Sequence, residues 1–137
     1  MITLGVRTSQ RQEMVRITRL LARTVGEAGW KDGVCTVFVP HTTAGITVNE
    51  NADPDVVTDL LYVLERLVPT RDPAYRHYEG NSAAHVKASL VGFSQSLIVR
   101  DGQLVLGRWQ DVLFCEFDGP RDRQVMLEFV PAAKGSK

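Results

Sequence analysis

The sequence predicts one α+β domain with mainly antiparallel sheets and about three helices. Short apolar, β-branched runs typical of strands are interleaved with apolar residues at helical spacing. Tight-turn sequences such as Asp101-Gly102 and Asp118-Gly119-Pro120 dominate the second half, which favours antiparallel hairpins. The length of 137 residues suits a single hydrophobic core. We therefore expect one domain over 1–137, with residues 131–137 as a flexible tail.

The first half is expected to begin with strands and one helix. Thr18 can cap a helix that Gly29 ends, because glycine readily adopts the left-handed conformation found after helices. Pro40 closes an apolar run, since proline cannot donate to a sheet ladder. The expected strands lie at 2–8, 13–17, 34–39 and 44–48.

Two further helices and four strands are expected in the second half. Asp53 before Pro54 is a strong start signal, a capping carboxylate followed by proline at the first helical position. The two helices should end before Pro69 and at Gly92. The expected strands lie at 94–99, 104–106, 112–117 and 124–130.

Composition excludes several classes of protein. Sixteen basic and sixteen acidic side chains give zero net charge, which argues against nucleic-acid binding through bulk charge and suits an oligomer. No apolar run reaches the roughly 18 residues of a membrane span, and the N-terminus lacks a signal-peptide pattern. Cys35 and Cys115 are expected as buried free thiols of a cytoplasmic protein.

The chain is organised around residues 40–59, an unusually long and polar connection between a strand and a helix. A purely structural connection needs about two to six residues. Here the stretch holds His41, the hydroxyls of Thr42 and Thr43, and several acids, which are side chains that bind metals, move protons or hold anions. We predict a functional site at this stretch.

The three histidines are candidates for a metal centre. His41 follows a strand, His77 lies in a polar loop and His85 falls in the first turn of a helix. Three imidazoles with an open fourth position form one kind of catalytic zinc site. Spacing alone fixes no geometry, so separate hydrogen-bonding roles stay open beside the metal site.

Two acids and two helix-start residues extend the candidate site. Glu50, at a strand end, could be a general base or a ligand for a hard cation. Asp53 is expected at least to cap its helix. Asn81 and Ser82 stand where a helix begins and could bind an anion through free backbone N–H groups, although capping alone explains them.

The last turn offers charges for phosphate or for one another. Arg121 could bind phosphate in a forked geometry, or pair with Glu116 and Asp118 across a strand end. Trp109 could stack on a planar ring, although a plug at the edge of the core is the favoured interpretation.

With these residues in view, the chain resembles the YjbQ-type family, often labelled secondary thiamine-phosphate synthases. The resemblance rests on three ordered motifs: PHTTAGITVNENADPDVVTDLL, HYEGNSAAHVKASLVG and DGQLVLGRWQDVLFCEFDGPRDR. It implies a small α+β subunit assembled as a homotrimer, and it suggests that the three histidines act together on a divalent metal. The remaining site residues it implies are Glu50, Asp53, Asn81, Glu116, Asp118 and Arg121.

The activity attached to the family joins a pyrimidine diphosphate to a thiazole phosphate and releases pyrophosphate. Metal ions and arginines suit this chemistry because negative charge develops on the departing pyrophosphate. Glu50 or a metal could orient the diphosphate, and Trp109 could stack on the pyrimidine. A metal-dependent hydrolase of a small phosphorylated or amide compound, and a non-enzymatic metabolite-binding module, are the two alternatives.

Overall fold

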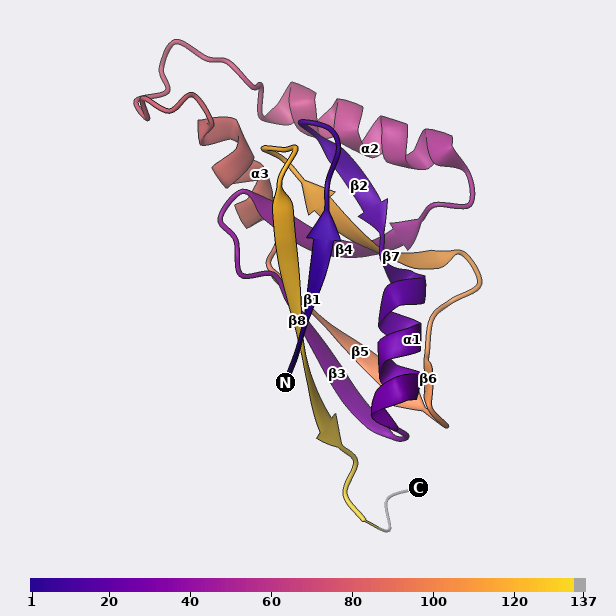
Figure 1. Cartoon of the computed structure of the whole chain (residues 1–137). Coiled ribbons are helices and arrows are strands. Elements are labelled where there is room, and N and C mark those ends of the chain that lie inside the picture. Colours follow the sequence, from indigo (N-terminus) through magenta and orange to yellow (C-terminus); the bar gives the residue numbers. More distant parts are fainter. Residues whose placement is uncertain (135–137) are drawn as a thin grey trace.

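Two antiparallel sheets and three helices make up the part of the chain, residues 1–134, that the computed structural model describes (Figure 1). The predicted α+β class is confirmed. The strands are β1 (Ile2–Arg7), β2 (Glu13–Arg16), β3 (Gly33–Phe38), β4 (Ala44–Glu50), β5 (Ser94–Arg100), β6 (Gln103–Leu104), β7 (Gln110–Glu116) and β8 (Asp122–Pro131). The helices are α1 (Thr18–Ala28), α2 (Pro54–Leu67) and α3 (Ser82–Val91).

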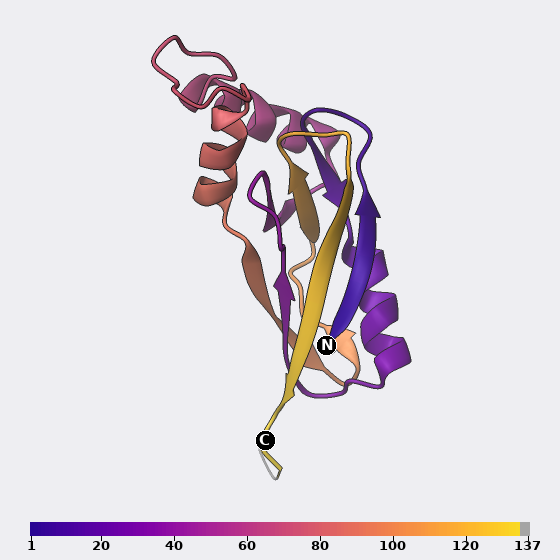
Figure 2. The ribbon, with the colours of Figure 1, turned by 60° about the vertical axis from the view of Figure 1, so that its left-hand side comes forward.

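The larger sheet runs the length of the molecule in the order β1-β8-β3-β5-β6 (Figure 2). Strand β8 lies between β1 and β3 and pairs antiparallel with both. In the β3–β8 ladder Phe38 lies opposite Met126, and β3 ends there, two residues before Pro40. The early end of β3 leaves part of the β8 edge open, and this part becomes one wall of the site described below.

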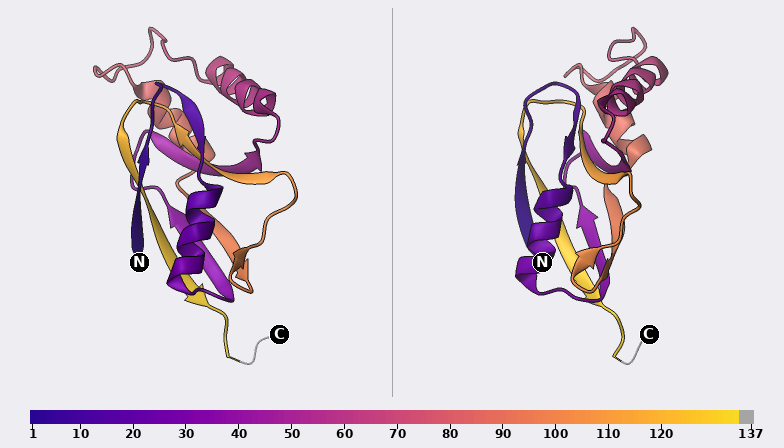
Figure 3. Two further views of the ribbon diagram at one scale, coloured as in Figure 1. Left: turned by 45° about the vertical axis from the view of Figure 1, so that its right-hand side comes forward. Right: turned by 90° about the vertical axis from the view of Figure 1, so that its right-hand side faces the viewer.

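The smaller sheet, in the order β2-β7-β4, shares the main core with the larger sheet and α1. Figure 3 shows α1 alongside the sheets. Burial of these apolar side chains is the main stabilising contribution to the fold. Fully buried members of this core include Leu21, Val37, Ile46, Phe114 and Leu127.

Helices α2 and α3 build a second, smaller core at the other side of the β2-β7-β4 sheet. Ala84 and Ala88 of α3 pack with Cys115 and Phe117, and side chains of α2 lie against this cluster. Within residues 1–134, α2 nevertheless has no buried residue, although its sequence carries an apolar stripe. The segment between α2 and α3 projects from the body of the molecule (Figures 1 and 2).

Helix boundaries mostly follow the predicted signals. Gly29 ends α1 with φ 72°, and the Asp53 carboxylate accepts a hydrogen bond of 2.9 Å from the Asp55 N–H at the start of α2. The prediction that Thr18 caps α1 is wrong. Its hydroxyl donates to Asp111 Oδ1 at 2.7 Å and accepts from the Val112 N–H at 2.9 Å, so it ties α1 to β7 instead.

The expected tail began too early. Pro131 is the last residue of β8, and the Ala132 N–H donates to the Asp32 carbonyl at 2.9 Å. Residues 135–137 of the predicted tail lie outside the described residues.

Cys35 and Cys115 are free and buried, as predicted. Burial raises the pKa of Cys35 to about 11 and that of Cys115 to about 12, so neither forms a thiolate at neutral pH. None of the helices over residues 1–134 has the length and apolar character needed to cross a bilayer.

Candidate functional site

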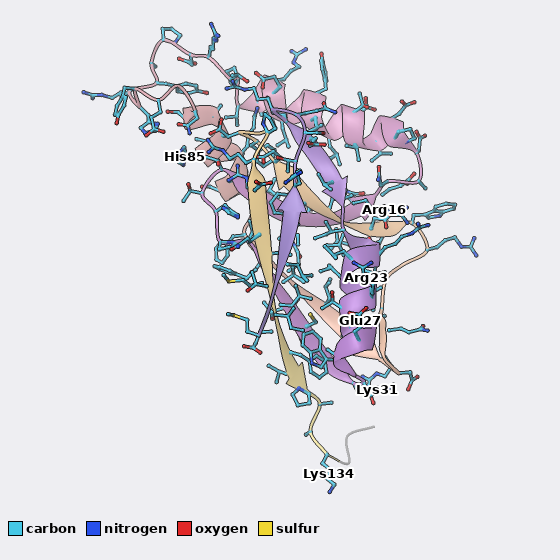
Figure 4. The ribbon with its side chains drawn as sticks, viewed as in Figure 1. Arg16, Arg23, Glu27, Lys31, His85 and Lys134 are labelled. Carbon is cyan, nitrogen blue, oxygen red and sulfur yellow. The ribbon has the colours of Figure 1, made fainter. Side chains whose placement is uncertain are left out.

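Three segments that are distant in sequence meet around one pocket of about 470 Å³. They are the turn after β3, the residues around the start of α3, and the connection between β7 and β8. Figure 4 shows His85 at the end of the molecule opposite Lys134. The pocket is lined by Pro40, His41, Thr42, Thr43, His77, Glu79, Asn81, His85, Asp118, Arg121 and Arg123.

His41 is attached to the open edge of β8. Its Nε2 accepts a hydrogen bond of 2.9 Å from the backbone N–H of Gln124. Burial, followed by the nearby Arg123 guanidinium, lowers the pKa of His41, and both favour a neutral imidazole at physiological pH.

Arg123 lines the pocket and forms a buried ion pair with Glu116 behind it. Arg123 donates from Nε to Glu116 Oε1 at 2.9 Å and from Nη2 to the other carboxylate oxygen. Burial opposes ionisation of Glu116, but hydrogen bonds from Arg123, the Asp118 N–H and Thr8 outweigh it and lower the pKa. Glu116 is 0% exposed. Its predicted catalytic role stays a prediction, and its position gives it access to the pocket only through Arg123.

Arg123 also reaches the turn that carries His41. Its Nη2 donates to Thr43 Oγ1 at 2.8 Å, and Thr43 is buried. Thr42, by contrast, is exposed at the rim of the pocket. Of the two threonines predicted to bind anions, one is engaged by an arginine and the other faces solvent.

Asn81, Asp118 and Arg121 form a second linked group. Asn81 Nδ2 donates to Asp118 Oδ2 at 2.9 Å, and Arg121 Nη2 donates to the same oxygen at 3.1 Å. Burial opposes ionisation of Asp118, but these two donors outweigh it and lower its pKa. Arg121 therefore pairs with Asp118, as one interpretation predicted, and it also lines the pocket, while phosphate binding stays a prediction.

The capping interpretation of Asn81 is wrong for its side chain. Asn81 occupies the N-cap position of α3, yet within residues 1–134 its side chain makes no capping bond, because the amide turns toward Asp118. Asn81 Oδ1 is buried and has no hydrogen-bond donor within those residues. Leaving a buried carbonyl oxygen unpaired costs about 1–3 kcal/mol, so Asn81 Oδ1 is an exception among the buried polar atoms of this region.

His77 and His85 approach each other, whereas His41 stands apart. The rings of His77 and His85 meet edge to face with centroids 5.6 Å apart, and His77 Nε2 lies 3.9 Å from Glu79 Oε1. Among residues 1–134 no group of three histidine, cysteine or acidic side chains is arranged to hold a metal ion. The predicted three-histidine centre is not assembled, and metal binding stays a prediction.

Glu50, Asp53 and Trp109 lie away from the histidines within one chain. Glu50 is at the far end of β4 from Ala44, and six residue steps along a strand span about 20 Å. Asp53 caps α2, as expected. Trp109 precedes Gln110, which pairs with Glu50. Trp109 is 59% exposed, so the interpretation that it plugs the edge of the core is wrong.

A second hollow of about 710 Å³ adjoins the first and shares His77 and Glu79 with it. Ser82 lines this second hollow, as do Arg11, Arg71 and Tyr75. No sequence pattern indicates Arg11 or Arg71, because a basic residue in a loop is ordinarily a solvated surface residue.

Comparison with known proteins gives one consistent family. The family model described as "UPF0047 protein YjbQ-like" matches residues 2–132. UPF0047 protein YugU of Bacillus subtilis is 48% identical over 128 residues, 93% of this chain and 97% of that protein. A UPF0047 protein of Methanocaldococcus jannaschii is 47% identical over 91% of this chain and 90% of its own length.

Solved structures agree with this assignment. A YjbQ/UPF0047 protein from Clostridium acetobutylicum has a TM-score of 0.91 at 50% identity, covering 95% of this chain and 100% of that one. A YbjQ-like protein of unknown function from Sulfolobus solfataricus has a TM-score of 0.90 at 31% identity, covering 96% of both chains.

Proposed function

The chain belongs to the UPF0047 family of YjbQ-like proteins, and we propose that its histidine-lined pocket binds and converts small phosphorylated metabolites. The proposed reaction is of the thiamine-phosphate synthase kind, in which a pyrimidine diphosphate joins a thiazole phosphate and pyrophosphate departs. One observation carries the proposal: hydrogen-bond donors from three segments, His41, His85 and Arg121 among them, converge on a single 470 Å³ pocket.

The adjoining hollow supports a reaction between two substrates. Each hollow lies in the size range of about 300–1,000 Å³ that is usual for small-molecule sites. Arg121 lines the first hollow, and Arg11 and Arg71 line the second. Each hollow therefore has at least one arginine that could bind a phosphate group. The shared His77 and Glu79 lie where two bound molecules would meet.

The residues of the pocket would contribute mainly by holding charge. Departure of pyrophosphate places negative charge on oxygen, and fixed donors aimed at that charge stabilise the transition state. Arg121 is oriented for this task by its bonds to Asp118. A divalent ion held by His77 and His85 would supply further charge neutralisation.

The test measures thiamine phosphate and pyrophosphate formed from the paired substrates. We expect Arg121→Ala to lower the rate about 10-fold or more, because bonds to charged groups contribute about 1.5–3 kcal/mol. Arg100→Ala is the matched control, since Arg100 is an exposed arginine at a separate hollow. Product no greater than that of heat-denatured protein would eliminate the transferase. Glu50 lies away from the histidines of its own chain. A loss of rate in Glu50→Gln would therefore indicate that Glu50 reaches the pocket of another subunit.

The His77–His85 pair favours a second candidate, a metal-dependent hydrolase of a small phosphorylated or amide compound. Zinc or manganese retained in a fixed ratio to protein, and reduced by His85→Ala, would support this function. Protein that is metal-free and cannot be reconstituted would rule it out. Phosphorylated-ligand binding without any turnover would identify a binding module, whereas turnover abolished by His41→Ala would exclude one.

We also propose that the chain associates with itself, as a homotrimer, in the cytoplasm. Exposed apolar side chains on α2 support association, because Leu67 is 70% exposed and Tyr62 is 58% exposed. We expect Leu67→Glu to reduce the mass measured by sedimentation, whereas Ala22→Glu, at an exposed position on α1, should leave it unchanged. A monomeric wild-type chain would contradict the proposal.

A further inference from the structure

We infer that His41 is locked in the tautomer that carries its proton on Nδ1, so that it serves the pocket as a fixed hydrogen-bond donor and not as a metal ligand. The group that locks it is the backbone N–H of Gln124. The inference rests on the proposed function only for the nature of the acceptor, a phosphoryl oxygen.

The geometry follows from the way β3 ends. Phe38 pairs with Met126, so if the ladder continued, Pro40 would lie opposite Gln124. β3 stops before that point, and the Gln124 N–H, which faces the side of β3, is left without its ladder partner. The imidazole of His41 takes this place, with 2.9 Å between its Nε2 and the Gln124 nitrogen. The bond satisfies a backbone donor and fixes the ring at once.

A backbone N–H is always a donor, and this determines the state of the ring. Nε2 can accept from Gln124 only if it carries no proton, so a neutral imidazole must carry its proton on Nδ1. Metal binding through Nε2 would break the bond to Gln124. Binding through Nδ1 would move the proton to Nε2, and the Nε2–H would then face the Gln124 N–H, a second donor. Histidine ligands ordinarily donate their second N–H to an acceptor, which is the reverse of this arrangement.

The proton on Nδ1 is available to a ligand. Within residues 1–134 Nδ1 has no hydrogen-bond partner, and it is not among the side-chain atoms shielded from solvent. His41 lines the same pocket as Arg121 and Asn81. The pocket therefore holds a fixed donor at His41 Nδ1 and the guanidinium of Arg121, a combination that suits a phosphoryl oxygen.

Nuclear magnetic resonance tests the tautomer directly. Long-range ¹H–¹⁵N correlation of the histidine rings identifies which nitrogen is protonated, and the chain has only three histidines. The His41 signals are assigned by their loss in His41→Asn. We expect a protonated Nδ1 and an unprotonated Nε2, with and without one equivalent of Zn²⁺. A protonated Nε2, or a His41 nitrogen that shifts on adding Zn²⁺, would overturn the inference.

A pair of variants separates the two nitrogens. The carbonyl of His41→Gln replaces Nε2 as an acceptor for Gln124, while the amide N–H of His41→Asn replaces the donor at Nδ1. Relative to His41→Ala, we expect the Gln variant to regain thermal stability but to bind pyrophosphate about 10-fold more weakly than wild type. The Asn variant should regain pyrophosphate affinity.

Wild-type pyrophosphate affinity in His41→Gln would mean that only the acceptor matters, and it would refute the role as a donor. Failure of the wild type to bind pyrophosphate would count against the proposed function instead, and the tautomer would still be decided by the ring spectrum.

Discussion

Lys87 offers the most direct test of how the loop that carries His77 is anchored. The side chain of Lys87, on α3, is 1% exposed. Its Nζ donates to Glu65 Oε1 at 2.7 Å and to Gln12 Oε1 at 3.0 Å. Glu65 also accepts from the backbone N–H of Thr70 at 2.6 Å. The change Glu65→Gln removes the negative charge and leaves a buried ammonium with neutral acceptors only.

The size of the effect follows from the pKa of Glu65. Burial opposes ionisation, but hydrogen bonds from Lys87 and Thr70 outweigh it and lower the pKa from 4.5 to about 2. Unscreened, that difference corresponds to about 3.4 kcal/mol of stability. The Glu65 side chain is 41% exposed, however, and solvent screens its interactions. We therefore expect Glu65→Gln to lower the free energy of unfolding by about 1–2 kcal/mol at pH 7.

The sign of the pH dependence is fixed by the same shift. The pKa of Glu65 is lower in the folded than in the unfolded chain, so its contribution is complete above about pH 4.5 and is lost as the pH falls toward 2. The difference between wild type and Glu65→Gln should stay constant from pH 5 to 8. Roughly half of it should be gone at pH 3.5.

Urea unfolding at several pH values measures this difference. The fluorescence of Trp30, which stacks on Phe129 with ring centroids 5.1 Å apart, reports loss of the core. Glu27→Gln is the matched control, because Glu27 is an exposed helical glutamate. The reasoning fails if Glu65→Gln destabilises no more than this control, or if its effect is the same at pH 3.5 and pH 7.

Two further substitutions test the buried parts of the fold. Glu116→Gln should lower the free energy of unfolding by about 3 kcal/mol or more in urea, since it leaves Arg123 buried without its counter-charge; a loss below 1 kcal/mol would contradict this. Gly45→Ala should lower the melting temperature by several degrees, because its Cβ would lie 2.7 Å from the Gly92 carbonyl oxygen. Gly5→Ala, with open space around it, should have little effect, and equal effects would refute the packing argument.

The helices and most strands were predictable because their signals are local. Gly29 and Asp53 act through the backbone within one turn of the chain, so neighbouring residues suffice to place them. Thr18 does not cap α1 because its hydroxyl binds Asp111 on a strand that is distant in sequence. A capping residue and a residue that ties two elements together have the same sequence appearance.

The site was predictable as a set of motifs but not as a geometry. His41, Asn81 and Arg121 were named from sequence, and the fold brings them to one pocket. Glu50 is near His41 in sequence, yet β4 carries it about 20 Å from Ala44, the residue at the other end of the strand. A strand is the secondary structure that most separates residues close in sequence, so density of polar residues along one is a poor guide to their convergence.

One buried pair connects the stability of the fold to the shape of the pocket. Glu116 binds Arg123 and the Asp118 N–H, while Arg123 binds Thr43 on the turn that carries His41. Asp118 in turn accepts from Asn81 at the start of α3. All three segments around the pocket therefore depend on bonds that lead back to Glu116. Without the Glu116 carboxylate, Arg123 would lose its main hydrogen-bond acceptor and its bond to Thr43 would change. We therefore expect Glu116→Gln to weaken ligand binding as well as stability, even though Glu116 is fully buried.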